Sequence, residues 1–282
     1  MEPAKIMGIV NVTPDSFSDG GAFLDPERAI AHGEELAGEG ADVIDIGGES
    51  TRPGAEAVPA EEELRRTDPV VRTLASRGYS VSIDTSKVAV AEAALDAGAA
   101  MVNDVTALRA EPELAALCAD RGCEVVVMHM LGEPRTMQEN PAYDDVVDDV
   151  KSFLAGRIEF AVSEGVDESR IWIDPGIGFG KTVEHNLALH RRLGELRELG
   201  RPIVFGSSRK SFIGKLTGTE VDERIGGTIA SNVIACANGA RMLRVHDVGP
   251  MRQALMIAEA VMRGGSARSH PINGGRIRES AN

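Results

Sequence analysis

Short apolar runs alternate with amphipathic stretches along almost the whole chain, and this alternation restricts the possible folds more than any other feature of the sequence. Apolar runs joined by helical patterns indicate parallel strands whose outer face is covered by helices. About eight such units in 282 residues fit one closed (β/α)8 (TIM) barrel of the α/β class. The runs are 6–10, 42–46, 80–84, 100–104, 124–130, 170–174, 202–207 and 241–247.

A doubly wound open sheet is the alternative arrangement of such units. It would usually carry a glycine-rich dinucleotide loop after an early strand, and the sequence has none. No low-complexity linker divides the chain, so we expect a single barrel domain over residues 1–265. Residues 266–282 are polar and glycine-rich and are expected to form a mobile tail.

Composition excludes several classes of protein. A net charge of −14 argues against broad nucleic-acid binding, and any anionic substrate would need a locally basic site. No apolar run approaches the roughly 20 residues of a membrane helix, and the N-terminus does not resemble a signal peptide. Cys118, Cys123 and Cys236 have no zinc-ligand spacing. Although a disulfide between the first two is an alternative, we expect reduced thiols and a cytoplasmic location.

Polar residues cluster where the expected strands end, which is where catalytic groups of such barrels lie. Each has a simpler role by itself: Asp84 could cap the next helix, Asn103 could satisfy barrel backbone groups, and His246 could pair with Asp247 inside the core. Capping does not explain charged groups at nearly every strand end, because buried charges are costly unless paired or used. The strand-end residues are Asn11, Asp84, Asn103, Asp174, Arg209, Lys210, Arg244 and His246.

These side chains suit a particular kind of ligand. Asp84, Asn103 and Asp174 offer acceptors and one amide to the edge of a planar heterocycle rich in N–H donors. Lys210 and Arg244 add cationic donors, and an arginine can also stack on a flat ring. The nearby polar and basic residues Asn11, Arg52, Arg209 and His246 suit a phosphorylated group.

The stretch "DPGIGFGKT" (174–182) raises the alternative of a nucleotide-binding loop. That motif requires glycine five residues before the Gly-Lys pair, and Pro175 stands there. Asp174 would also repel a phosphate. A Ser-x-x-Lys nucleophile at "SSRK" (207–210) lacks its companion motifs. Neither alternative is favoured.

Taken together, the motifs resemble those of dihydropteroate synthases. The resemblance covers residues 6–263 and follows "NVTPDSFSDGG", "GGESTRPG", "SIDTSK", "VNDV", "MHMLGEPRTMQ", "DPGIGFGK", "SSRKSFIG" and "RVHDV". It implies condensation of 6-hydroxymethyl-7,8-dihydropterin pyrophosphate with p-aminobenzoate, with Mg²⁺, to give 7,8-dihydropteroate and pyrophosphate. It also implies small-molecule substrates, a homodimer and a sulfonamide target.

The resemblance also assigns site residues. The catalytic residues would be Lys210, Arg244, Asp19 and Arg52. The pterin would contact Asp84, Asn103, Asp174, Phe179, Lys210 and Arg244. Pyrophosphate would contact Asn11, Arg52, Arg244 and His246, with Asn11 also meeting the metal. The p-aminobenzoate would contact Phe17, Thr51, Pro53 and Ser211, between mobile loops 12–22 and 50–56.

Two rival functions use the same barrel. A pterin-dependent methyltransferase shares an Asp/Asn pocket, but it would not need the loops "TPDSFSDGG" and "STRPG" or the lysine of "SRK". A non-catalytic pterin-binding paralogue would have no use for intact loops, although sequence alone leaves this alternative open. The synthase interpretation predicts that pyrophosphate departs first from a methylene of cationic character, and that the amine then attacks this carbon.

Overall fold

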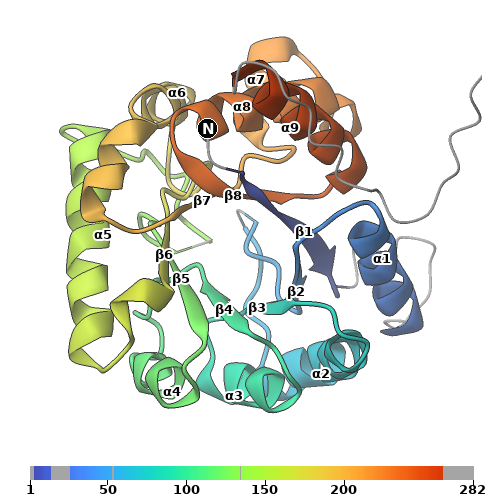
Figure 1. Cartoon of the computed structure of the whole chain (residues 1–282). Coiled ribbons are helices and arrows are strands. Elements are labelled where there is room, and N and C mark those ends of the chain that lie inside the picture. Colours follow the sequence, from blue (N-terminus) through green and yellow to red (C-terminus); the bar gives the residue numbers. More distant parts are fainter. Residues whose placement is uncertain (1–2, 14–25, 53, 134, 263–282) are drawn as a thin grey trace, which may run out of the picture.

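The computed structural model describes residues 3–13, 26–52, 54–133 and 135–262. Its strands form one closed parallel barrel in the order β1 to β8 (Figure 1). The predicted (β/α)8 fold is therefore confirmed. The strands are β1 Lys5–Asn11, β2 Val43–Gly47, β3 Val81–Asp84, β4 Met101–Asp104, β5 Glu124–Met128, β6 Ile171–Asp174, β7 Ile203–Phe205 and β8 Ala240–Val245.

Helices surround the barrel and connect its strands (Figure 1). The link from β7 to β8 contains two α-helices, α7 and α8. The α-helices are α1 Pro26–Gly38, α2 Ala60–Ser76, α3 Val88–Asp96, α4 Glu113–Arg121, α5 Val146–Ser163, α6 Val183–Arg191, α7 Ser211–Thr217, α8 Ile225–Ala237 and α9 Val248–Met262. Short 3-10 turns are η2 Glu168–Arg170, η3 Leu193–Leu199 and η4 Val221–Glu223. The predicted tail, 266–282, lies outside the described residues.

Strand periodicity explains where the core and the polar residues lie. Successive side chains of a strand point to opposite faces. Ile44 and Ile46 therefore pack outward against the helices, while Asp45 between them points into the barrel. A separate apolar cluster fills the part of the barrel interior nearest the amino-terminal ends of the strands: Met7, Val43, Met101, Val126, Trp172, Val204 and Met242. Above this layer, toward the carboxyl ends of the strands, the interior residues become polar.

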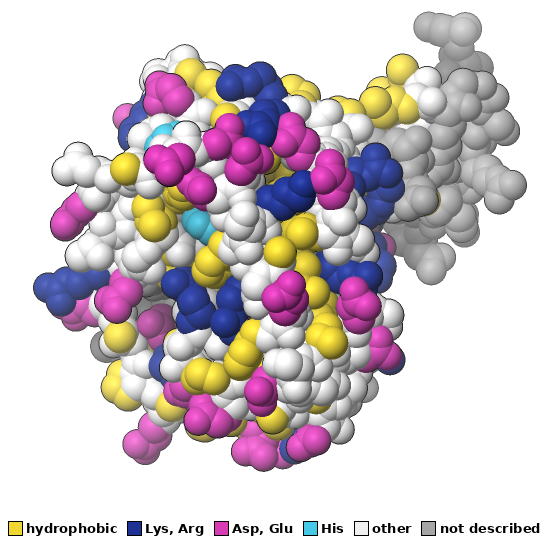
Figure 2. Space-filling model, turned by 90° about the vertical axis from the view of Figure 1, so that its left-hand side faces the viewer, with side chains coloured by type: hydrophobic (Ala, Val, Ile, Leu, Met, Phe, Trp, Pro, Cys, Tyr) yellow, Lys and Arg dark blue, Asp and Glu magenta, His cyan; other side chains and the backbone are white. Residues whose placement is uncertain are grey.

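The surface shows no single dominant charge on the side formed by α5. Acidic and basic side chains are interspersed there with scattered apolar ones (Figure 2). No helix within the described residues is both long and apolar enough to cross a membrane. Cys118, Cys123 and Cys236 are buried free thiols, so the alternative of a 118–123 disulfide is wrong for this structure.

Candidate active site

Three predicted pterin residues meet at the carboxyl end of the barrel. Asp84, Asn103 and Asp174 end or nearly end β3, β4 and β6, and all three are buried. The strand register places Asp84 beside Asn103, and Asp174 beside Met128 of β5. One oxygen of Asp174 accepts a 2.7 Å hydrogen bond from the backbone N–H of Gly176, which fixes the carboxylate at the start of the following loop.

Arg244 crosses the barrel mouth from β8 and connects two carboxylates. Its Nε donates to Asp45 and its Nη2 donates to Asp84, each at 2.6 Å. Asn103 Nδ2 donates to the same oxygen of Asp45 at 3.1 Å. The second oxygen of Asp45 is buried and has no partner among the described residues. Asp45 is therefore the centre of this hydrogen-bond network.

Asp45 is not among the site residues predicted from the sequence, because it does not stand at a strand end. Asp45 lies in the middle of β2, between two isoleucines. A signal was present in the sequence, since a single aspartate in an apolar strand must be paired or used when buried. Its position, alternating with outward-facing Ile44 and Ile46, also directs it into the barrel.

Lys210 and Phe179 form another wall of the mouth. Lys210 Nζ lies 4.1 Å from the centroid of the Phe179 ring, within the range of a cation–π contact. Gly178 makes room for this arrangement, because a Cβ there would lie 3.2 Å from Cδ of Lys210. Burial lowers the pKa of Lys210 to about 8, with further lowering by the positive charges of Arg244 and Arg52.

Burial also shifts the pKa values of the carboxylates in the mouth. The pKa of Asp84 is raised to about 7 by burial and by the charges of Asp45 and Glu63, against the opposing effect of Arg244. Burial raises the pKa of Asp174 to about 6, although the Gly176 N–H and Lys210 oppose the shift. Acceptors with so little hydration form strong hydrogen bonds with a ligand that supplies matching N–H donors.

His246 follows β8 and lies close to the Ser208 hydroxyl. Ser208 Oγ is 3.2 Å from the backbone N–H of His246, from which it accepts, and 2.9 Å from His246 Nδ1. If the hydroxyl donates to Nδ1, the remaining ring proton lies on Nε2. Burial, Arg244 and Arg209 lower the pKa of His246 to about 3, so the imidazole is neutral near pH 7. His246 can thus act as a hydrogen-bond donor without carrying charge.

Arg209, expected near a phosphorylated group, is paired with Asp247 in this structure. Its guanidinium makes a bidentate pair with Asp247, at 3.0 and 2.6 Å. Its φ of 55° lies in the left-handed region, where a residue other than glycine is strained. The side chain is therefore committed to a structural ion pair.

The remaining predicted residues lie at the rim or outside the described residues. Asn11 ends β1 beside Gly47 and is half-buried. Thr51 is half-buried and Arg52 is exposed, while Ser211 begins the seven-residue helix α7 and is exposed. Phe17, Asp19 and Pro53 belong to the residues that the structure leaves undescribed.

The residues of "GKT" have roles unlike those of a nucleotide loop. Lys181 is 3% exposed and its Nζ bonds His129 Nδ1 at 2.9 Å and the Phe179 carbonyl at 3.0 Å. The Thr182 hydroxyl caps α6 by accepting from the His185 N–H. Neither side chain is free to hold a phosphate or its metal, which disfavours the nucleotide-binding alternative.

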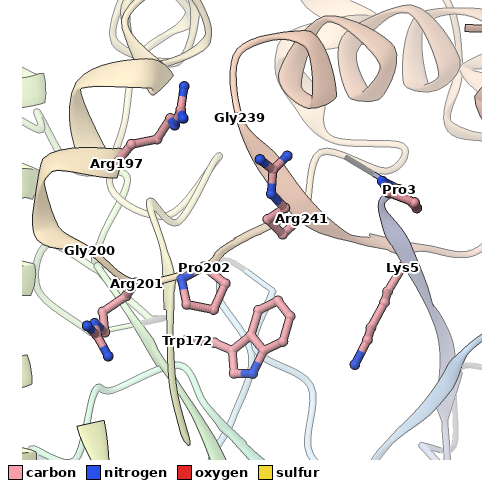
Figure 3. A pocket seen from close by; sticks show the side chains of 9 residues that line it. All are labelled: Pro3, Lys5, Trp172, Arg197, Gly200, Arg201, Pro202, Gly239 and Arg241. Atoms are coloured by element: carbon pink, nitrogen blue, oxygen red, sulfur yellow. The ribbon is translucent and has the colours of Figure 1, made fainter. Parts of the chain in front are cut away.

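A cavity of about 390 Å³ lies at the opposite, amino-terminal end of the barrel. Trp172 and Pro202 form its centre, and Lys5, Arg197, Arg201 and Arg241 border it (Figure 3). Arg201 is bound to Glu168 there. Polar groups at this end of such barrels usually serve stability. The buried carboxylates with shifted pKa values lie at the other end, which is therefore the candidate active site.

Comparisons with known proteins agree with this location. The family described as pterin binding enzymes matches residues 7–246. A dihydropteroate synthase from Synechocystis sp. is 46% identical over 260 residues, covering 92% of this chain and 90% of that protein. The Xanthomonas albilineans dihydropteroate synthase structure with 4-aminobenzoic acid has a TM-score of 0.87 at 50% identity, covering 93% of this chain and 94% of that one.

A second Xanthomonas albilineans structure, in complex with 7,8-dihydropteroate, has a TM-score of 0.84 at 48% identity. It covers 93% of this chain and 94% of that chain. The family match spans nearly all of the barrel, including each strand that carries a mouth residue. The similarity is therefore not confined to a shared fold, and this chain belongs to the dihydropteroate synthase family of pterin-binding enzymes.

Proposed function

We infer that this protein condenses 6-hydroxymethyl-7,8-dihydropterin pyrophosphate with p-aminobenzoate, giving 7,8-dihydropteroate and pyrophosphate. The observation that carries this conclusion is the convergence of Asp45, Asp84, Asn103, Asp174 and Arg244 in one buried polar mouth. Family membership supplies the reaction, because relatives of nearly the same length are dihydropteroate synthases. The structures of relatives with 4-aminobenzoic acid and with 7,8-dihydropteroate support both the substrate and the product.

The pterin is proposed to lie edge-on against the carboxylates. Asp174 and Asp84 would accept hydrogen bonds from its N–H groups, and Asn103 would use its amide oxygen or nitrogen. Phe179 and Lys210 form the wall beside the ring. Arg244 is already oriented by two aspartates, so its planar guanidinium can stack on the pterin without losing much freedom.

Departure of pyrophosphate is the step that the rim residues would assist. The bond between the pterin methylene carbon and the pyrophosphate oxygen breaks, the oxygen keeps the electron pair, and the carbon gains cationic character. Arg52, Arg244 and the Nε2–H of neutral His246 would stabilise the departing anion. The p-aminobenzoate nitrogen then forms the new bond and releases a proton. Asp19 is proposed to stabilise the cationic carbon.

Magnesium is proposed as the cofactor. The described residues contain no group of three or more His, Cys, Asp or Glu side chains suited to hold a metal ion. That fits Mg²⁺, which is commonly bound through one or two protein groups together with substrate phosphates. The amide oxygen of Asn11 would provide the protein ligand. When bound, the ion would neutralise charge on the leaving pyrophosphate.

The p-aminobenzoate site is proposed to form from the two loops and from α7. Thr51 and Pro53 would contribute from the loop after β2, and Phe17 from the loop after β1. Ser211 at the start of α7 would donate to the substrate carboxylate. Because Thr51 is half-buried and Ser211 is exposed, we propose that the site closes around the substrate only after the pyrophosphate is bound.

A homodimer is proposed on the basis of an apolar groove along α8 and α9. The groove has a volume of about 650 Å³ and includes Ile229, Val233, Ile257 and Val261. Ile257 is 64% exposed and Val261 is 75% exposed, which is unusual for large apolar side chains on neighbouring turns. Light scattering should give twice the monomer mass, and Ile257→Asp should reduce it.

The three buried free thiols support a cytoplasmic location.

The function is tested by incubating the protein with pterin pyrophosphate, p-aminobenzoate and Mg²⁺ and measuring dihydropteroate. Omission of either substrate is the control, and Asp174→Asn is the matched variant with weakened pterin binding. Formation of dihydropteroate that requires both substrates and is reduced in the variant supports the synthase. Binding of pterin without any product would instead identify a non-catalytic pterin-binding paralogue. Transfer of a methyl group from a methylated pterin to an added acceptor, in a separate incubation, would identify the methyltransferase.

A further inference from the structure

Two buried or half-buried lysines, Lys181 and Lys87, lie behind the walls of the mouth and are not used by the reaction as derived above. Lys181 belongs to the loop that follows β6. Its ammonium bonds Nδ1 of His129 at 2.9 Å, the carbonyl of Phe179 at 3.0 Å and the carbonyl of His129 at 3.5 Å. These three acceptors match the three donors of one ammonium group. Lys181 thus joins the loop after β6 to the loop after β5.

This junction determines where one wall of the pterin pocket lies. Phe179 is two residues before Lys181, and its ring contacts Lys210. The two loops are also in close backbone contact at Gly176, where a Cβ would lie only 1.9 Å from the His129 carbonyl oxygen. The Phe179 backbone is therefore attached directly to Lys181, while Asp174 begins the same loop.

Lys87 lies between the start of α3, helix α2 and the segment after β2. It stands at the N-cap position of α3 without a side-chain capping bond, and its ammonium bonds both Glu49, in the segment after β2, and Glu63 of α2. Glu63 is fully buried. The neighbouring Gly48 carbonyl accepts a 2.8 Å hydrogen bond from Arg66 of α2. Lys87 therefore attaches to α2 the segment that leads into Thr51 and Arg52.

We propose that Lys181 and Lys87 are positioning residues with separate tasks, Lys181 fixing the pterin wall and Lys87 fixing the loop that completes the p-aminobenzoate site. The proposal rests on the proposed function for the identity of the two substrates. The side chain of Lys181 bonds the loops after β5 and β6, the second of which carries Asp174 and Phe179. The side chain of Lys87 bonds Glu49, which leads into Thr51 and Arg52, and Glu63 of α2. Loss of one contact should consequently affect one substrate and leave the other unchanged.

The electrostatic environments of the two lysines also differ. Burial lowers the pKa of Lys181 to about 7, opposed by Asp174 and reinforced by Lys210. Burial acts on Lys87 in the same direction, but Glu49 and Glu63 outweigh it and raise its pKa. Lys87 therefore acts as one charge of an ionic cluster, whereas Lys181 acts mainly as a donor to neutral groups.

The test uses one variant at each contact. Lys181→Met removes every donor at nearly the same length, and Lys181→Gln retains two. Glu49→Gln weakens the contact of Lys87 with the loop while Lys87 keeps its bond to buried Glu63, which avoids leaving that lysine without a charged partner. Lys151→Met, which removes a partly exposed lysine of α5 paired with Glu198, is the matched control. Thermal unfolding of each variant checks that the barrel is intact.

We expect the variants at the two contacts to affect different substrates. Lys181→Met should weaken pterin binding, measured by calorimetry, at least about tenfold, because several hydrogen bonds to the wall are lost. Lys181→Gln should restore part of this affinity. Glu49→Gln should raise KM for p-aminobenzoate about fivefold or more and lower kcat, because the loop is no longer held by a charge-assisted bond. In each case the other substrate should change by less than about twofold, like the Lys151→Met control.

Two outcomes overturn the proposal. One is that both variants affect both substrates equally, which indicates general loosening of the barrel. The other is that both variants behave like Lys151→Met. A wild-type protein that binds pterin but makes no product would contradict the proposed function instead. In that case calorimetry would still measure the effect of the Lys181 variants on pterin binding. The effect of Glu49→Gln would be measured as p-aminobenzoate binding in the presence of pterin and pyrophosphate.

Discussion

The carboxylate of Asp45 accepts a 2.6 Å hydrogen bond from Nε of Arg244, a residue 199 positions away in the sequence. The same oxygen accepts from Asn103, and Asp84 binds the other end of the guanidinium. Burial lowers the pKa of Arg244, but the negative charges of Asp45 and Asp84 outweigh this effect, so the pKa is raised overall. Arg244 is thus a permanent cation with a fixed orientation before any ligand arrives.

The first prediction concerns Asp45→Asn. This change keeps the shape of the side chain but removes the charge that orients Arg244 and Asn103. We expect pterin affinity to fall at least about tenfold, because a hydrogen bond to a charged group contributes about 1.5–3 kcal/mol. Calorimetry with the dihydropterin, beside urea unfolding, measures both binding and stability. Asp68→Asn, which alters an exposed pair with Arg72, is the control and should change neither. Unchanged pterin affinity would limit Asp45 to a structural role.

The sequence predicted the barrel because its signal is repeated along the whole chain. Each apolar run is short, and no single run distinguishes a strand from a buried helix. Their regular alternation with amphipathic stretches leaves few architectures. Every strand begins and ends within two residues of its predicted run. The polar residues at strand ends were predictable for the same reason, since a closed barrel brings them together.

Contacts between distant residues could not be predicted in this way. Lys181 binds His129, 52 residues earlier, and nothing in either local sequence specifies that contact. Arg209 looks like an anion-binding residue in "SSRKS", but its backbone at φ 55° turns the side chain to Asp247. In both cases a three-dimensional neighbour determines the role of the charge, and only the structure identifies that neighbour.

The second prediction concerns Asp174→Asn and pH. Burial raises the pKa of Asp174 from 3.8 to about 6. Between these values the folded protein holds more protons than the unfolded chain, so this residue makes stability fall as pH rises through the window. Asp174→Asn should therefore increase the free energy of unfolding at pH 8 by up to about 3 kcal/mol relative to wild type.

The same variant should lose pterin affinity at least about tenfold, because a charged acceptor is replaced by an amide. Wild-type affinity should also fall as pH drops below about 6, where Asp174 becomes protonated. The affinity of the variant should lack this component. Urea unfolding and calorimetry at pH 5, 6.5 and 8 are the measurements. A variant that binds pterin normally would exclude Asp174 from the site.

The third prediction concerns the order of binding. Of the described residues proposed for p-aminobenzoate, Thr51 is half-buried and Ser211 is exposed, whereas Asp84, Asn103 and Asp174 of the pterin pocket are buried. We therefore expect the protein alone to bind p-aminobenzoate weakly, and addition of dihydropterin, pyrophosphate and Mg²⁺ to strengthen binding. Equilibrium dialysis with labelled p-aminobenzoate measures the change. Equal affinity with and without pyrophosphate would contradict loop closure around the anion.

The last prediction separates a synthase from a passive pterin binder through Arg52. This residue is exposed in the segment after β2, yet its charge helps to lower the pKa of Lys210, which places it on the same side of the barrel. Because Arg52 would act on the pyrophosphate or on the p-aminobenzoate site, its contribution should appear mainly in the transition state. Arg52→Ala should thus leave binding of the bare pterin nearly unchanged and slow condensation about a hundredfold or more.

Arg72→Ala, which removes an exposed arginine of α2, is the control for general charge effects. Synthesis within about threefold of wild type would show that the loop is not catalytic. A parallel loss of pterin affinity would place Arg52 in the buried pocket, and the proposed division between the pterin pocket and the anion-binding rim would then be wrong.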